Sequence, residues 1–72
     1  MNNQNIINQL VDLAADKREL THSLQRLDCK ELADNYWHEF NGMIDCITVV
    51  ANCKWIDAFD MVVDRMIERE RK

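Results

Sequence analysis

The chain has 72 residues, a net charge of -4, one glycine and no proline. A chain this short forms one domain at most, and it buries only about 60% of the surface that its unfolded form exposes. Its acidic balance disfavours nucleic acid as a partner, because phosphate binding needs a basic face. Sheet proteins of this size need glycine and proline for their turns, so their scarcity predicts an all-α fold.

The first predicted helix runs from about residue 3 to 27, and its apolar residues follow alternating four- and three-residue steps: Ile6, Leu10, Leu13, Leu20, Leu24 and Leu27. Lys17 occupies the missing position, where its stem can be buried while its ammonium stays in water. This spacing is typical of a helix seam of the coiled-coil kind. The sequence leaves open whether the helix is continuous through residues 15–18.

Part of this segment, INQLVDLAADKREL at residues 7–20, is similar to the first helix of the all-α chorismate mutases. The resemblance is confined to this stretch. The arginine and lysine residues that the family uses are not matched downstream, so no residue role is transferred.

The second predicted helix runs from about residue 29 to 51. Asp28 is the expected N-cap, in a capping box with Glu31. Placed at 100° steps, the apolar residues span an arc of roughly 180°, wider than the ~100° that a surface helix needs. The arc contains Leu32, Ala33, Tyr36, Trp37, Phe40, Met43, Ile44, Ile47, Val50 and Ala51. Its width predicts a helix covered from two sides.

The middle of this helix, NYWHEFNGMIDCI at residues 35–47, is predicted to be core along most of its apolar side. Its aromatic residues suit either the core or the anchors of a protein interface. The single glycine lies near a cysteine and a valine at the border of the apolar arc, where a second helix could approach closely. The predicted partner or dimer contacts are therefore Tyr36, Trp37, Phe40, Gly42, Cys46 and Val49.

Asn52 is predicted to end the second helix in the left-handed conformation, and the third helix is expected from about residue 55 to 69. Its predicted apolar face comprises Trp55, Ile56, Phe59, Val62, Val63, Met66 and Ile67. Short connections favour antiparallel neighbours. The predicted fold is a single antiparallel three-helix bundle.

Three groups of residues are candidate sites. Asp34, His38 and Asp45 share one side of the second helix, but they lack the spacing of a zinc motif such as HExxH, so a solvated surface is expected. Cys29, Cys46 and Cys53 contain no CxxC pair; Cys46 is expected as a small apolar residue, and Cys29 could have a lowered thiol pKa at its helix terminus. The third helix carries an acidic row, comprising Asp57, Asp60, Asp64 and Glu68. It suits solvent, a basic partner or, as a weaker alternative, magnesium in an all-α nucleotide hydrolase.

From these observations we expect a small, non-enzymatic interaction or regulatory protein of the bacterial or phage type, with no cofactor or metal. It would form a homodimer, because its apolar surface exceeds what three short helices can hide, and it would bind an unidentified larger protein. The odd number of cysteines, the absence of a secretory signal and of any membrane-spanning run point to the cytoplasm. The alternative is a nucleic-acid-associated regulator with a dimeric basic patch formed by Lys17, Arg18, Arg26 and the basic residues near the end of the third helix.

Overall fold

A computed structural model describes residues 3–71, which form three α-helices and no strand. Helix α1 spans Asn3–Arg26, α2 spans Lys30–Ala51 and α3 spans Trp55–Glu70. These bounds lie within one residue of those expected from the sequence, and α1 is continuous through residues 15–18. Along residues 3–71, no helix combines the length and the apolar character that a bilayer crossing needs.

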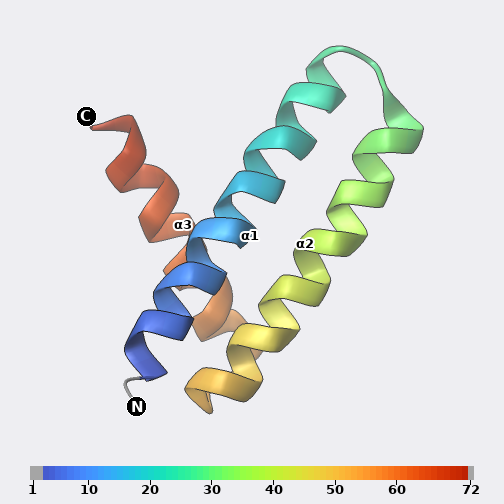
Figure 1. Ribbon diagram of the computed structural model, residues 1–72. Helices are drawn as coiled ribbons and strands as arrows, with labels where there is room; N and C mark the ends of the chain where they lie inside the picture. The colour runs from blue at the N-terminus through green and yellow to red at the C-terminus, as the bar shows by residue number, and fades with distance from the viewer. Residues whose placement is uncertain (1–2, 72) are drawn as a thin grey trace.

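Helices α1 and α2 run antiparallel, side by side, and form a hairpin (Figure 1). Helix α3 packs against both of them, but it crosses behind α1 at a steep angle in the view of Figure 1 and diverges from the hairpin toward its C-terminus. All three pairs of helices are therefore in contact. Only one face of the hairpin is covered by α3, and its other face carries no further element from the described residues.

The connection between α1 and α2 overturns one prediction. Asp28 has a φ of 61°, its N–H bonds to the carbonyl of Gln25, and the next N–H, of Cys29, bonds to the carbonyl of Leu24. This is the Schellman arrangement that closes a helix C-terminus. The predicted capping box with Glu31 is wrong, because Asp28 belongs to the end of α1 and Cys29 is the N-cap of α2, without a side-chain cap bond.

Because Asp28 is the left-handed cap of α1, replacing it by glycine should stabilise the protein. We expect Asp28→Gly to raise the free energy of unfolding by about 0.5–1 kcal/mol, because the left-handed region costs most L-residues roughly 1–2 kcal/mol and glycine nothing. Asp28→Ala should lower it. Urea denaturation of the three proteins at one concentration measures both changes, and a loss of stability in the glycine variant would contradict the assignment.

The α2–α3 connection confirms the second cap prediction. Asn52 is left-handed, with φ 53° and ψ 52°, and its N–H bonds to the carbonyl of Thr48. The N–H of Cys53 reaches the same carbonyl, so α2 ends as a left-handed cap requires. Lys54 then takes an extended conformation and starts α3 without a side-chain cap bond.

The core lies where the three helices meet, and small residues dominate it. Its fully or nearly fully buried apolar residues are Val11, Ala14, Ala15, Phe40, Ile44, Ile47, Ala58 and Val62. Thr21 is buried as well, and its hydroxyl donates to the carbonyl of Lys17 at 2.8 Å, so its polar atom is satisfied. The alanines let the helix backbones approach closely, and Phe40 fills the largest share of the remaining space.

Several residues of the predicted apolar faces lie outside this core. On α2, Leu32 is half exposed, so the buried arc near the N-terminus of this helix is narrower than the predicted one. On α3, Trp55, Ile56 and Ile67 are exposed, whereas Ala58 and Val62 are buried. Because α3 crosses the hairpin instead of lying along it, it buries a short central patch and leaves the rest of its apolar side uncovered.

Candidate functional site

Four exposed apolar residues are spaced seven apart, three of them on α1 and the fourth directly after it, and we call them the heptad stripe: Ile6, Leu13, Leu20 and Leu27. Their side chains are 40%, 51%, 41% and 72% exposed. At 100° per residue, the stripe lies about 150° around the helix from the buried set of Val11, Ala14 and Ala15. Helix α1 therefore has two apolar faces, and the fold of one chain uses only the face with the smaller residues.

The heptad stripe borders on the α2 side of the hairpin. Leu10, Lys17 and Leu24, the remaining positions of the coiled-coil seam, are partly buried. Lys17 lies 3.6 Å from Glu39 of α2, and its ammonium is 4.9 Å from the ring centre of Tyr36. The seam thus runs along the junction of α1 and α2. Covering the four stripe residues, which expose the equivalent of about two whole side chains, would contribute ~3–6 kcal/mol.

A second apolar surface is built from aromatic rings, which we call the aromatic row: Trp37, Phe40, Phe59 and Trp55. Trp37 stacks on Phe40 with ring centres 5.5 Å apart, Phe40 meets Phe59 edge-on at 6.0 Å, and Phe59 stacks on Trp55 at 5.3 Å. The row therefore joins α2 to α3. Phe40 is fully buried, whereas the two tryptophans at the ends of the row stay partly exposed.

Arg18 lies against the aromatic row. Its guanidinium carbon is 5.0 Å from the ring centre of Phe59, 5.5 Å from that of Phe40 and 5.8 Å from that of Trp37. These distances allow cation–π attraction to three rings. Its Nη1 is buried, and no acceptor among residues 3–71 bonds to it. An unsatisfied buried donor costs about 1–3 kcal/mol, which offsets much of that attraction.

We therefore expect Arg18→Met to leave stability unchanged or to raise it by about 1 kcal/mol, because an apolar side chain of similar length keeps the ring contacts and removes the unpaired donor. Arg18→Ala should instead lower the free energy of unfolding, because it also removes the packing of the stem. Thermal denaturation followed by circular dichroism separates the two variants. A clear loss in the methionine variant would show that the charge itself stabilises the fold.

The predicted contact residues occupy different environments. Tyr36 is partly buried beside Lys17, and Trp37 is partly exposed at the end of the aromatic row. Phe40 has 0% exposure, so it offers no surface to a partner, contrary to its place among the predicted contacts. Gly42, Cys46 and Val49, which we call the contact strip, are exposed on α2. Apart from its chain neighbours and the backbone of its own helix, no described residue lies within 4 Å of where a Cβ on Gly42 would stand.

The polar residues that are candidate metal ligands do not come together in the structure. Asp34, His38 and Asp45 are exposed on α2, as are the four members of the acidic row on α3. Within residues 3–71, no three His, Cys, Asp or Glu side chains are grouped so that they could hold a metal ion. Three free thiols are present among the described residues: Cys46 is exposed, and Cys29 and Cys53 are partly buried.

An ion-pair network joins α1 to α3, and sequence reasoning missed it. Arg65 pairs with Asp12, and Arg69 pairs with Asp16 at 2.8 Å and with Glu19 at 3.3 Å. Burial alone would lower the pKa of Arg69, but the hydrogen bonds and charges of the Asp16 and Glu19 carboxylates outweigh it and raise the pKa. A signal was present in the sequence: three acids spaced four and three apart on the first helix, and two arginines four apart on the third.

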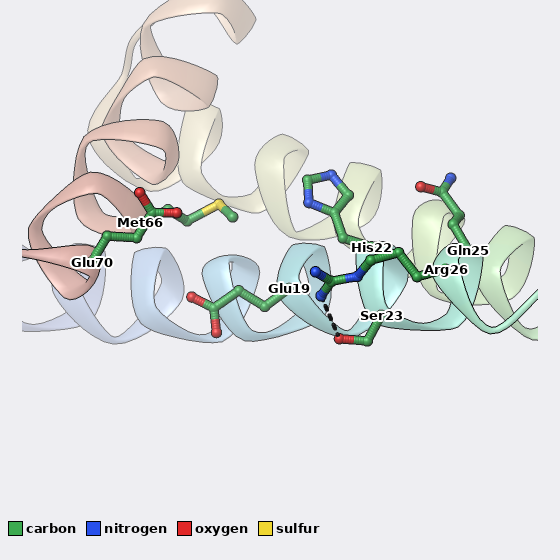
Figure 2. Close-up of a pocket in the computed structure, with 7 residues that line it drawn as sticks. All are labelled: Glu19, His22, Ser23, Gln25, Arg26, Met66 and Glu70. Carbon is green, nitrogen blue, oxygen red and sulfur yellow. Dashed lines mark hydrogen bonds between the residues drawn. The ribbon is translucent and has the colours of Figure 1, made fainter.

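An open groove of about 770 Å³ lies between the second half of α1 and the C-terminal half of α3, where the two helices diverge (Figure 2). Its lining residues are Glu19, His22, Ser23, Gln25, Arg26, Met66 and Glu70. Met66 and Glu70 come from α3, and the other five come from α1. Arg26 donates to the Ser23 hydroxyl at 3.4 Å. The lining mixes both signs of charge with one apolar residue, so it shows no preference for a particular ligand.

In the comparisons with known proteins, no family model, no curated protein and no solved structure matches this chain. The two apolar surfaces, the heptad stripe and the aromatic row, are the features that the fold of one chain leaves exposed.

Proposed function

We propose that this protein is a small, non-enzymatic interaction or regulatory protein of the cytoplasm, which forms a homodimer and binds a larger protein. The observation that supports the proposal is the heptad stripe, because four large apolar side chains in one line remain exposed. Soluble monomers seldom expose contiguous apolar patches beyond a few hundred Å². A chain whose own core is small gains stability when a second chain covers such a surface.

The second exposed surface suits the larger partner. Trp37 and Trp55, each about two-fifths exposed, flank the packed rings of Phe40 and Phe59. Tryptophan and arginine are enriched among the residues that dominate binding energy at interfaces, and Arg18 lies directly against these rings. This surface and the heptad stripe are separate, so one could serve self-association while the other binds the partner.

The nucleic-acid alternative is not favoured by the charges. Arg65 and Arg69 are paired with carboxylates of α1, and Lys17 is paired with Glu39. Arg18 is held against aromatic rings. The cations that a basic patch would need are thus mostly engaged within the chain. A DNA-binding assay across salt concentrations tests the alternative, since phosphate contacts give a steep salt dependence.

Native mass spectrometry of protein purified gently without a chelator is the first test of the proposal. A dimer without metal or adduct is the expected result. A monomer carrying a stoichiometric metal would overturn it and direct attention to Asp34, His38 and the acidic row. Partner capture should then be compared for the wild type and Trp37→Ala, where loss of one specific partner at unchanged stability would assign the aromatic row to partner binding.

A further inference from the structure

We propose that the dimer interface is the face of the α1–α2 hairpin opposite α3, centred on the heptad stripe, and that a second copy of the chain covers it. Two hairpins would then pack face to face as a four-helix assembly. This inference rests on the proposed homodimer and assigns its geometry. The same face includes Glu39 of α2 and, at helical spacing, Gly42 and Cys46 of the contact strip, so the interface predicted on α2 extends onto α1.

The spacing of the stripe specifies the kind of partner. A strict seven-residue repeat of apolar residues is the pattern by which one helix packs along another in a coiled coil. In this chain the residues that meet α2 and α3 are a different set, with Val11, Ala14 and Ala15 at its centre. The heptad stripe therefore stays exposed in the folded chain. Its spacing suits packing against a helix of a second chain.

The charges of the face favour a second copy over a basic or an acidic partner. The charged residues along the junction, Lys17 and Glu39, pair with each other, so the face is close to neutral although the chain has a net charge of -4. The carboxylates of Asp12, Asp16 and Glu19 are engaged by the arginines of α3. An apolar, nearly neutral face can approach its own copy without the repulsion that the rest of this acidic chain would cause.

The available area matches that of a stable dimer. Helix α1 has 24 residues, so a face of two adjacent helices is about 36 Å long and about 20 Å wide, which gives ~700 Å². A standard interface buries about 800 Å² on each partner. One hairpin face is thus close to the size that a specific dimer requires.

The stripe also suits twofold symmetry. In a twofold dimer, residue i contacts residue j of the other copy and residue j contacts residue i. If two α1 helices pack antiparallel about the middle of the stripe, Leu13 lies opposite Leu20 of the second copy, and Ile6 lies opposite Leu27. Lys17 is then near the symmetry axis, where two lysines and two Glu39 carboxylates form a neutral group of four charges.

The test is sedimentation equilibrium of the full chain with two acidic substitutions on the stripe, Leu13→Asp and Leu20→Asp. Each places an unpaired carboxylate in the proposed interface, so we expect the dimer dissociation constant to rise by about 100-fold or more. Ile56→Asp is the matched control, because Ile56 is 56% exposed on α3, which covers the other face of the hairpin. It should leave the dissociation constant unchanged.

A third variant excludes simple loss of folding as the explanation. Replacing the pair together, as Lys17→Leu with Glu39→Gln, completes the apolar seam without leaving an unpaired carboxylate. Since a charged residue at a seam position costs stability, we expect this double variant to dimerise about 10-fold more tightly. An unfolded protein would not give this result. An unchanged or weaker dimer of the double variant would overturn the proposed interface.

The outcomes separate this inference from the proposed function. A wild-type chain that stays monomeric would refute both the dimer and its interface. A wild-type dimer that survives the stripe substitutions but dissociates in Ile56→Asp would keep the homodimer and move the interface to α3. A dimer that none of the three acidic substitutions affects would also overturn the proposed interface, while leaving the homodimer intact.

Discussion

Replacing Phe40 by alanine should lower the free energy of unfolding by ~3–5 kcal/mol. Phe40 is fully buried, and its ring contacts Trp37 on one side and Phe59 on the other. The substitution removes the largest buried side chain and leaves a cavity that the backbones of three helices hold open. A domain of this size has a total stability of roughly 4–11 kcal/mol, so the variant should be partly or wholly unfolded at room temperature.

Urea denaturation at one fixed protein concentration measures this loss, since a dimer links stability to concentration. Phe40→Leu keeps most of the buried volume and should lose only about 1 kcal/mol, so it serves as a variant that still folds. Leu32→Ala is the matched control on the same helix, because Leu32 is half exposed. If Phe40→Ala lowers the free energy of unfolding by less than 1 kcal/mol, this ring is not part of the core.

Enlarging a small core residue should also be costly. We expect Ala58→Leu to lower the free energy of unfolding by about 1–3 kcal/mol, because a well-packed core has no room for extra methylene groups. Ala58 is fully buried at the place where α3 packs on the hairpin. Leucine is the more hydrophobic residue and a good helix former, so a prediction from hydrophobicity alone would have the opposite sign.

The matched control is Asp60→Leu, an exposed position two residues away on α3. Its effect on stability should stay within about 0.5 kcal/mol. Thermal unfolding followed by circular dichroism compares the two variants, with the amide spectrum of the folded state as a check on helix packing. Equal stability of wild type and Ala58→Leu would mean that α3 is free to move away from the hairpin at this position.

The helices and their limits were predictable because local chemistry sets them. Apolar periodicity, the scarcity of glycine and proline and a residue suited to the left-handed cap at Asn52 act over one or two turns of chain. Asp28 shows the limit of such reasoning. Aspartate is favoured both at N-caps and, among residues other than glycine, in the left-handed region. Which of the two roles it takes depends on where the preceding helix stops.

The candidate site was only partly predictable. The sequence singled out Trp37 and Tyr36, and both remain partly accessible. It also predicted that the chain has more apolar surface than it can bury, which agrees with the exposed heptad stripe. It did not reveal the place of Arg18 among the aromatic rings or the pairing of Arg69 with Asp16 and Glu19. These contacts join residues far apart in the chain. The spacing of the acids and arginines permits the ion pairs, but no local pattern shows that the two helices meet.

The sequence by itself determined that this protein consists of three helices with short connections and that the first helix carries a seam of leucine and isoleucine residues. Only the tertiary structure decided that a second apolar side of this helix, made of smaller residues, faces the core. The leucines of the heptad stripe form the more hydrophobic side, yet α1 turns Val11, Ala14 and Ala15 toward α2 and α3. The physical reason is distance: three helices that meet around one large ring, that of Phe40, can pack closely only where their facing residues are small, and the larger leucines are left on the outside.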